Sequence, residues 1–571
     1  MGVCYERKGV LCALLLVFLS LLALSIADDA PPSAQVSPSA ACNDTTDPTF
    51  CRTVLPPRGS SDLYTYGRFS VARSLDSAQR FAGLVDRYLA RHRRLSSAAV
   101  GALRDCQLMS ELNVDFLTAA GAALRTTDTM LDPQTDDVHT LLSAILTNQQ
   151  TCFDGLQTAS AAWSDRDGLA VPIANGTKLY SLSLSLFTRA WVPTAKPPKH
   201  GGSKNPHHGH GGGKKPPAAA NRRGLFDAAD DEMARRMAIE GPEMTVAVNG
   251  VVTVDQSGAG NYTTIGDAVA AAPTNLDGST GYHVIYVPAG VYEENVVVPK
   301  HKKYIMMVGD GIGQTVITGN RSVVDGWTTF NSATFAVVGQ GFVAMNITFQ
   351  NTAGPSKHQA VAFRSGADLS AFYGCSFEAY QDTLYTHSLR QFYRGCHVYG
   401  TVDYVFGNAA VVFQDCTFFS RLPMAGQCNT VTAQGRSDPN QNTGTSIQGC
   451  SLVAAPELAA ATAGYRTLTY LGRPWKNYSR TVVMESYVGE LVDPTGWMPW
   501  SGDFALDTLF YAEYNNSGPG ADTSRRVSWP GFHVLGSGVD AGNFTVTSMV
   551  LGDNWLPQTG VPFTRGFVTS T

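Results

Sequence analysis

Two aspartates and two glutamines in the second half of the chain have spacings that would allow them to act together. Asp382 and Asp403 are 21 residues apart, and Gln359 and Gln381 are 22 residues apart. If the chain repeats at about this period, these residues lie on neighbouring strands, whose backbones are about 4.8 Å apart. Two carboxylates that close cannot both ionise easily, so the pKa of one rises while the other stays low. Such a pair could supply an acid and a nucleophile; the alternative is that both aspartates are structural turn residues.

A third segment, YLGRPW at 470–475, offers a guanidinium and an indole two residues apart. Arg473 can hold a carboxylate in a bidentate geometry and keep it ionised. Trp475 can stack on a sugar or cap the core. The sequence contains neither a Gly-x-Ser-x-Gly elbow nor His-Glu-x-x-His nor a phosphate loop, which argues against a serine esterase and a zinc hydrolase.

The elements that must position these residues are short β-rich runs, which follow one another from residue 245 onward without a helical period. A weak repeat, a small residue with an apolar residue shortly after it, recurs at steps of 29, 21, 20 and 34 residues, at Asn346, Cys375, Cys396, Cys416 and Cys450. Unequal steps around a constant core predict an all-β domain over 241–571, a right-handed parallel β-helix whose loops vary in length. A β-sandwich or a propeller is the alternative.

The first half of the chain predicts a different domain. Apolar residues at helical spacing predict helices over 74–90, with a serine cap, and over 96–124 and 136–156. Helices that each carry one apolar stripe form a bundle, so we expect an all-α four-helix bundle over 42–190. A basic Gly/Pro/His-rich segment at 191–240 predicts a linker, and we interpret its histidines as linker residues rather than as a metal site.

The N-terminus indicates the secretory route. Arg7 and Lys8 precede an apolar run that ends at Ala27, which predicts a cleaved signal peptide over 1–27, with an uncleaved anchor as the alternative. We therefore expect a secreted protein that is not stably inserted in a membrane. A net charge of −5 argues against a nucleic-acid partner. The dibasic pairs Arg222-Arg223 and Arg235-Arg236 would suit a processing protease.

An oxidising route permits disulfides among the nine cysteines beyond residue 27, four in the first half and five in the second, but their spacing does not fix the pairing. Because nine is odd, at least one thiol must stay free, and Cys428 is the candidate.

Long ordered segments then identify a family. Residues 244–568 resemble plant pectin methylesterases in segments that include KHQAVAF, YQDTLY, GTVDYVFGNAAVVFQDC and YLGRPWKNYSRTVVM. Residues 42–190 resemble the pectin methylesterase inhibitor domain at ALRDCQ and LLSAILTNQQTCFDGL, with His139 where that family usually has tryptophan.

The resemblance implies a pectinesterase that demethylates cell-wall pectin after secretion to the cell wall, without a cofactor or metal. It implies Asp403 as nucleophile and Asp382 as proton donor and general base, with the oxyanion held by Gln381 and Gln359. Substrate binding would involve Thr329, Gln359, Arg473 and Trp475, and candidate cleft aromatics are Tyr385, Phe406 and Trp500.

The resemblance also implies the disulfides Cys42–Cys51, Cys106–Cys152, Cys375–Cys396 and Cys416–Cys450. The inhibitor-like domain would be an intramolecular partner that inhibits the enzyme or aids its export until a protease cuts the linker, with Arg235-Arg236 as the expected site. The alternative functions are a pectin-cleaving hydrolase or lyase and a non-catalytic wall-binding or inhibitor protein.

Overall fold

The computed structural model describes residues 31–90, 95–159, 168–193, 246–461 and 467–568. The predicted signal peptide, the linker histidines and both dibasic pairs lie outside these residues. The described residues on the two sides of the segment 193–245 belong to one compact unit. None of the helices in the described part of the chain is both long and apolar enough to cross a membrane.

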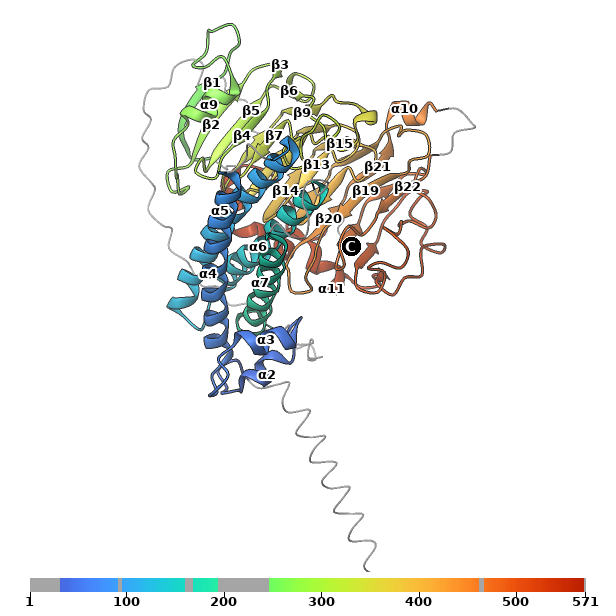
Figure 1. The fold of residues 1–571 in the computed structure, drawn as a ribbon. Helices are drawn as coiled ribbons and strands as arrows, with labels where there is room; N and C mark the ends of the chain where they lie inside the picture. Colours follow the sequence, from blue (N-terminus) through green and yellow to red (C-terminus); the bar gives the residue numbers. More distant parts are fainter. Residues whose placement is uncertain (1–30, 91–94, 160–167, 194–245, 462–466, 569–571) are drawn as a thin grey trace, which may run out of the picture. The chain divides into compact units, whose positions relative to one another are not determined.

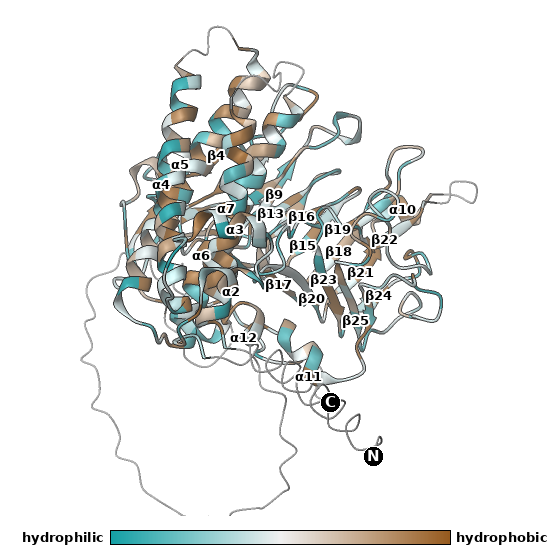
Figure 2. Ribbon diagram, turned by 60° about the horizontal axis from the view of Figure 1, so that its bottom comes forward, coloured by the Kyte–Doolittle hydropathy of each residue, from teal (hydrophilic) through white to brown (hydrophobic). Residues whose placement is uncertain are grey.

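Four long helices form the predicted bundle, and two short helices precede them. Figure 2 shows apolar and polar residues alternating along these helices, and the apolar ones form a shared core. The bounds are α2 Pro38–Cys42, α3 Pro48–Val54, α4 Leu63–Leu89, α5 Ser97–Thr126, α6 Asp132–Thr158 and α7 Ala170–Trp191.

The predicted start of the first long helix is wrong. Helix α4 begins at Leu63 rather than at Ser74, because Asp62 provides the cap by accepting a hydrogen bond from the Thr65 N–H at 2.7 Å. Ser74 lies inside the helix and is fully buried, with its hydroxyl 2.8 Å from that of Ser183. A serine that satisfies its hydroxyl across two helices has the same sequence signature as a cap.

Three parallel sheets form the second domain, and each coil of the chain adds one strand to each sheet, as a parallel β-helix requires. Figure 1 shows strands of successive coils side by side, from β2 and β5 in green to β20 and β22 in orange. The first sheet contains β1 Val248–Thr253, β2 Tyr282–Val287, β5 Ile305–Gly309, β8 Val343–Met345, β11 Ser370–Tyr373, β14 Arg390–Arg394, β17 Ala410–Gln414, β20 Gly444–Gln448, β23 Arg480–Met484, β25 Phe510–Tyr514 and β26 Phe532–Val534.

The other two sheets have seven and eight strands. The seven-stranded sheet contains β4 Val296–Val298, β7 Phe335–Val337, β10 Phe363–Ser365, β13 Leu384–Thr386, β16 Val405–Gly407, β19 Asn429–Gln434 and β22 Thr469–Gly472. The eight-stranded sheet contains β3 Gly290–Glu293, β6 Thr315–Gly319, β9 Thr348–Asn351, β12 Ser376–Glu378, β15 His397–Gly400, β18 Thr417–Ser420, β21 Ser451–Ala454 and β24 Tyr487–Val488. Short helices lie at α9 Ile265–Ala271, α10 Pro456–Ala459, α11 Gly538–Ala541 and α12 Val546–Met549, with 3₁₀ turns at Pro355–Lys357, Gly542–Phe544, Gly552–Asn554 and Leu556–Thr559.

The repeat found in the sequence is the register of the eight-stranded sheet. Phe349 pairs with Phe377, then Val398, Phe418 and Leu452 follow, one in each coil. The observed steps are 28, 21, 20 and 34 residues, so only the first predicted step is wrong. Equivalent side chains stack along the axis; the rings of Phe349 and Phe377, for example, are stacked with centroids 5.7 Å apart. These stacks fill the core of the β-helix.

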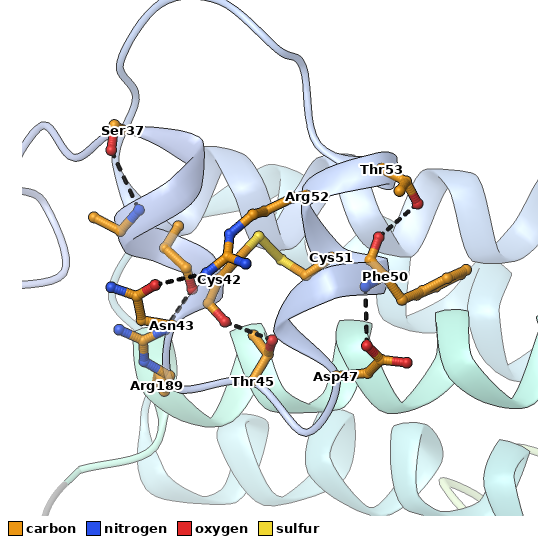
Figure 3. The surroundings of a disulfide bond; sticks show 12 residues. Ser37, Cys42, Asn43, Thr45, Asp47, Phe50, Cys51, Arg52, Thr53 and Arg189 are labelled. Atoms are coloured by element: carbon orange, nitrogen blue, oxygen red, sulfur yellow. Dashed lines mark hydrogen bonds between the residues drawn. A yellow bond between two sulfur atoms is a disulfide. The ribbon is translucent and has the colours of Figure 1, made fainter.

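The two disulfides implied for the bundle are formed. Cys42–Cys51 joins α2 to α3, as Figure 3 shows together with the Asp47 cap of α3, and Cys106–Cys152 joins α5 to α6. The constraint lies in the bundle because two short capped helices cannot bury much apolar surface without a covalent link.

The two disulfides implied for the β-helix are absent from the structure, where Cys375, Cys396, Cys416 and Cys450 are buried thiols. The four occupy equivalent positions on consecutive coils, so the two inner ones each have a sulfur neighbour on both sides. Their sulfur atoms also contact backbone; the Cys416 N–H, for example, lies 3.3 Å from Cys450 Sγ. Cys428 is free and partly buried.

Candidate active site

Asp382 and Asp403 occupy the same position on consecutive coils. Each precedes its strand by two residues, and those strands, β13 and β16, pair with Leu384 beside Val405. Both aspartates adopt left-handed backbone conformations, with φ of 64° and 52°. A non-glycine residue with positive φ is uncommon, and aspartate tolerates it better than most residues. Both side chains are buried, at 7% and 6% exposure, so the fold places two carboxyl groups side by side with little water around them.

Asp403 is held as a carboxylate by two neighbours. Arg473 donates to it from Nε to Oδ1 at 2.8 Å and from Nη2 to Oδ2 at 2.7 Å, which is the bidentate geometry predicted from the sequence. The Thr430 hydroxyl donates to Oδ1 at 2.7 Å and accepts the Asp403 backbone N–H at the same distance. Three donors therefore stabilise the ionised form and fix its orientation.

Asp382 has a different environment. Its side-chain oxygens accept no hydrogen bond from the described residues, and its backbone N–H donates to the Val402 carbonyl. Burial and the adjacent Asp403 charge raise the pKa of Asp382 well above its usual value, although Arg473 opposes this shift. The two aspartates thus differ as an acid and base pair requires: one is held ionised while the other favours its protonated form.

The predicted amides lie beside the aspartates. Gln359, Gln381 and Thr329 line the same cavity of about 620 Å³ as both aspartates and Arg473. The two glutamines are not equivalent by register, because the Ala360 N–H donates to the Gln381 carbonyl, which places Gln359 one residue further along. Their side-chain amides make no hydrogen bonds with the described residues, so their N–H groups are available to a ligand.

Aromatic side chains form much of the cavity wall. Trp475, Tyr385, Phe406 and Trp500 all line it, as predicted. The rings of Tyr385 and Phe406 are stacked 4.1 Å apart, and Phe406 meets Trp475 edge to face at 6.0 Å. Trp500 lies under the guanidinium of Arg473 at 4.4 Å and is 37% exposed. Among the described residues, no group of three or more His, Cys, Asp or Glu side chains is arranged to hold a metal ion.

The bundle contributes to the same cavity. Asp154 of α6 accepts hydrogen bonds from Lys476 Nζ at 2.8 and 3.1 Å, and Asp105 of α5 accepts one from the Thr328 hydroxyl at 2.6 Å. Burial raises the pKa of Asp105 to about 7, although the Thr328 hydrogen bond and the charge of Arg364 lower it. His139 lies buried with Nε2 2.7 Å from the Asn440 carbonyl, and burial lowers its pKa to about 4.

Sequence reasoning missed several residues at this site. Thr430 continues the column of Asp382 and Asp403, since Thr432 pairs with Val405, but a loop lengthens that coil to 27 residues. Asp154 and Lys476 were missed because a contact between two domains leaves no periodic signal. Extending the aspartate column by strand register, rather than by a constant step, would have found Thr430.

Comparisons with known proteins agree with this geometry. The pectinesterase family matches residues 251–553, and the family described as plant invertase/pectin methylesterase inhibitor matches residues 37–186. The relative named probable pectinesterase/pectinesterase inhibitor 41, from Arabidopsis thaliana, is 53% identical over 93% of this chain and 95% of its own length. Probable pectinesterase/pectinesterase inhibitor 20 from the same plant is 52% identical over 93% and 94%.

A solved structure of pectin methylesterase from carrot is 55% identical and has a TM-score of 0.54, covering 57% of this chain and all of that one. The pectinesterase family accounts for more than half of the chain, and the curated relatives match along nearly its whole length. The chain therefore belongs to the plant pectinesterase family (EC 3.1.1.11), in the group that carries a pectin methylesterase inhibitor domain before the pectinesterase domain.

Proposed function

We propose that the chain removes methyl esters from pectin with Asp403 as the nucleophile. Its carboxylate attacks the ester carbonyl carbon of a methylated galacturonate unit. Oδ1 already accepts two hydrogen bonds and Oδ2 only one, so Oδ2 is the oxygen that we assign to the attack. Arg473 keeps this carboxylate ionised and oriented.

The remaining steps use the amides and the second aspartate. N–H groups of Gln359 and Gln381 stabilise the tetrahedral oxyanion, at roughly 3–4 kcal/mol for each donor. Protonated Asp382 gives its proton to the departing methoxide, which leaves as methanol. The resulting carboxylate then takes a proton from water, which attacks the acyl-enzyme and releases galacturonate and free Asp403. Thr329 and Trp475 would contact the substrate.

The observation that carries this mechanism is the unequal treatment of two adjacent carboxyl groups, since Arg473 and Thr430 donate to Asp403 alone. It is tested by methanol release from highly methylated pectin. We expect Asp403→Asn to lower kcat below about a thousandth of the wild-type value, because an amide is a poor nucleophile.

Asp415→Asn is the matched control for that test. Asp415 also has a positive φ, of 53°, at a corner of the β-helix, but it pairs with Arg394 outside the cavity. We expect this variant to stay within about twofold of wild type, as a surface substitution should. Near wild-type turnover by Asp403→Asn would exclude the mechanism, and a fall in pectin viscosity during the reaction would indicate chain cleavage instead.

We also propose that the bundle inhibits the enzyme while it remains attached. Support comes from its contributions to the cavity wall, where Asp154 holds Lys476 and Asp105 holds Thr328. Pectin is a long polymer and needs a groove with open ends, whereas helices α5 and α6 supply part of the walls here. Cutting the linker would open the groove.

We propose further that the protein is secreted to the cell wall and that a secretory-pathway protease cuts after Arg235-Arg236. The basis is the signal-like N-terminus and the dibasic pairs in the sequence. N-terminal sequencing of the enzyme extracted from the wall tests this proposal. A start near Met237 supports it, a start near Gly224 assigns the other pair, and a start near Asp28 contradicts processing.

A further inference from the structure

The structure contains a second arginine–tryptophan stack at the cavity. The Arg321 guanidinium carbon lies 3.9 Å from the ring centroid of Trp327, and Trp327 is 41% exposed and lines the cavity that contains Asp382 and Asp403. It resembles the stack of Arg473 on Trp500, except that the Arg473 charge is already engaged by Asp403.

The charge of Arg321 is not engaged in this way. None of the ion pairs found among the described residues includes Arg321, and burial alone lowers its pKa. The acidic group in its own loop, Asp325, is already bound by Lys357 and by the Ser322 hydroxyl. A half-buried guanidinium without an acidic partner has donors available for an anion.

Backbone hydrogen bonds fix the position of this stack relative to the proposed catalytic groups. The Val323 N–H donates to the carbonyl of Gln359 at 3.1 Å, and Asn351 Nδ2 donates to the carbonyl of Arg321 at 2.9 Å. The loop is closed on itself by the Trp327 N–H, which donates to the Ser322 carbonyl. The stack is therefore attached to the residue proposed to hold the oxyanion, and it is rigid enough to select a ligand.

The chemistry of the stack suits one kind of sugar. An exposed indole face binds the apolar face of a pyranose ring, and a guanidinium binds a carboxylate in a planar, charge-assisted geometry. A methyl ester has no charge and offers the guanidinium only weak acceptors. The pair would therefore distinguish free galacturonate from its methyl ester.

We propose that Arg321 and Trp327 form a subsite that binds the free carboxylate of an already demethylated galacturonate unit while another unit of the same pectin chain is hydrolysed. This inference rests on the proposed function, which supplies the polymer and the reaction. Each turnover creates one new carboxylate, so such a subsite favours esters that lie near earlier products. The expected result is runs of free acid along the polymer.

The test compares Arg321→Gln and Trp327→Ala with wild type in the full-length chain. The first readout is calorimetric binding of fully demethylated hexagalacturonate, and the second is the distribution of free acids in partly demethylated pectin, measured by NMR. We expect Arg321→Gln to weaken hexagalacturonate binding about threefold to tenfold, as a partly exposed charge pair allows. Trp327→Ala should weaken it similarly, whereas Trp327→Phe, which keeps a ring, should retain most of it.

Arg525→Gln is the matched control, because Arg525 is an exposed arginine outside the cavity and its loss changes the net charge equally. Equal effects of Arg321→Gln and Arg525→Gln would overturn the subsite, as would a wild-type protein that binds no hexagalacturonate. Unchanged runs of free acid in the Arg321→Gln product would do the same. If the wild type releases no methanol, the proposed function fails, while hexagalacturonate binding by the variants still decides the subsite.

Discussion

At the scale of single residues, two chemically identical aspartates acquire different properties from their neighbours. Asp403 accepts hydrogen bonds from Arg473 and Thr430, whereas burial and the Asp403 charge raise the pKa of Asp382. A proton donor must be protonated before the reaction, so the rate should fall as pH rises through the raised pKa of Asp382. The activity should therefore extend to a higher pH than an ordinary aspartic acid would permit.

Thr430 offers a sharp test of how Asp403 is positioned. Thr430→Val removes the hydroxyl that donates to Asp403 Oδ1 and accepts its backbone N–H, so we expect kcat/KM to fall about tenfold to a hundredfold. Thr432→Val is the matched control, since that buried hydroxyl donates to the Leu471 carbonyl instead. Each variant should lower the free energy of unfolding by about 1–3 kcal/mol. Equal activity losses in the two variants would contradict a specific role for Thr430.

The sequence allowed the aspartate column to be predicted but not its full surroundings. Asp382 and Asp403 lie in coils of nearly equal length, so their spacing reveals their contact. Gln359 and Gln381 were expected to be in register, and a backbone hydrogen bond from Ala360 shows that they are one residue out. Spacing reports strand register only within strands, and both glutamines lie in the turns before them.

At the scale of elements, the turn after β19 must make room for the segment that contains Trp475. A Cβ atom on Gly435 would lie 2.8 Å from a Trp475 ring atom, closer than real side chains approach. Gly435→Ala should therefore displace the indole and raise KM for pectin about tenfold, with a smaller change in kcat. In the control Gly536→Ala, the added Cβ meets nothing within 4 Å. An unchanged KM in Gly435→Ala would show that Trp475 does not contact the substrate.

The fold itself was predictable where side chains repeat. Stacked core positions such as Phe377 and Val398 recur in each coil and reveal the β-helix. The start of α4 was missed because Ser74 satisfies its hydroxyl inside the bundle. The pairing of Cys375, Cys396, Cys416 and Cys450 could not follow from spacing either, because residues stacked at one position have equivalent neighbours.

At the scale of the whole molecule, acidic residues of the bundle meet basic residues of the β-helix. Asp154 binds Lys476, Asp115 binds Lys300 at 2.7 Å, and the buried Arg390 is bound by Asp136 and Asp137 of α6 and by Asp368 of its own domain. Their geometry contributes specificity more than affinity, because partly exposed pairs stabilise a contact by only about 0–1 kcal/mol each.

Asp105 should make this association depend on pH. Its pKa is raised to about 7 in the attached state, where it is buried against Thr328, from an ordinary value near 3.8 when exposed. A raised pKa means that the attached state binds the proton more tightly, so attachment weakens as pH rises from about 4 to about 7. The opposite shift of His139, to about 4, weakens attachment as pH falls below its ordinary value of 6.5, so the two groups act in opposite directions.

We therefore expect Asp105→Asn to remove the first of these dependences. An amide stays neutral, so attachment of the variant should not weaken between pH 4 and 7. The ratio of wild-type to Asp105→Asn methanol release by the full-length chain should then rise across this range by at least about tenfold, the effect of one pKa unit. Asp115→Asn, which removes only a partly exposed ion pair, should keep the wild-type pH dependence. A ratio that stays flat from pH 4 to 7 would mean that Asp105 does not regulate the enzyme, because both proteins share the same catalytic groups and differ only in whether this carboxyl can ionise.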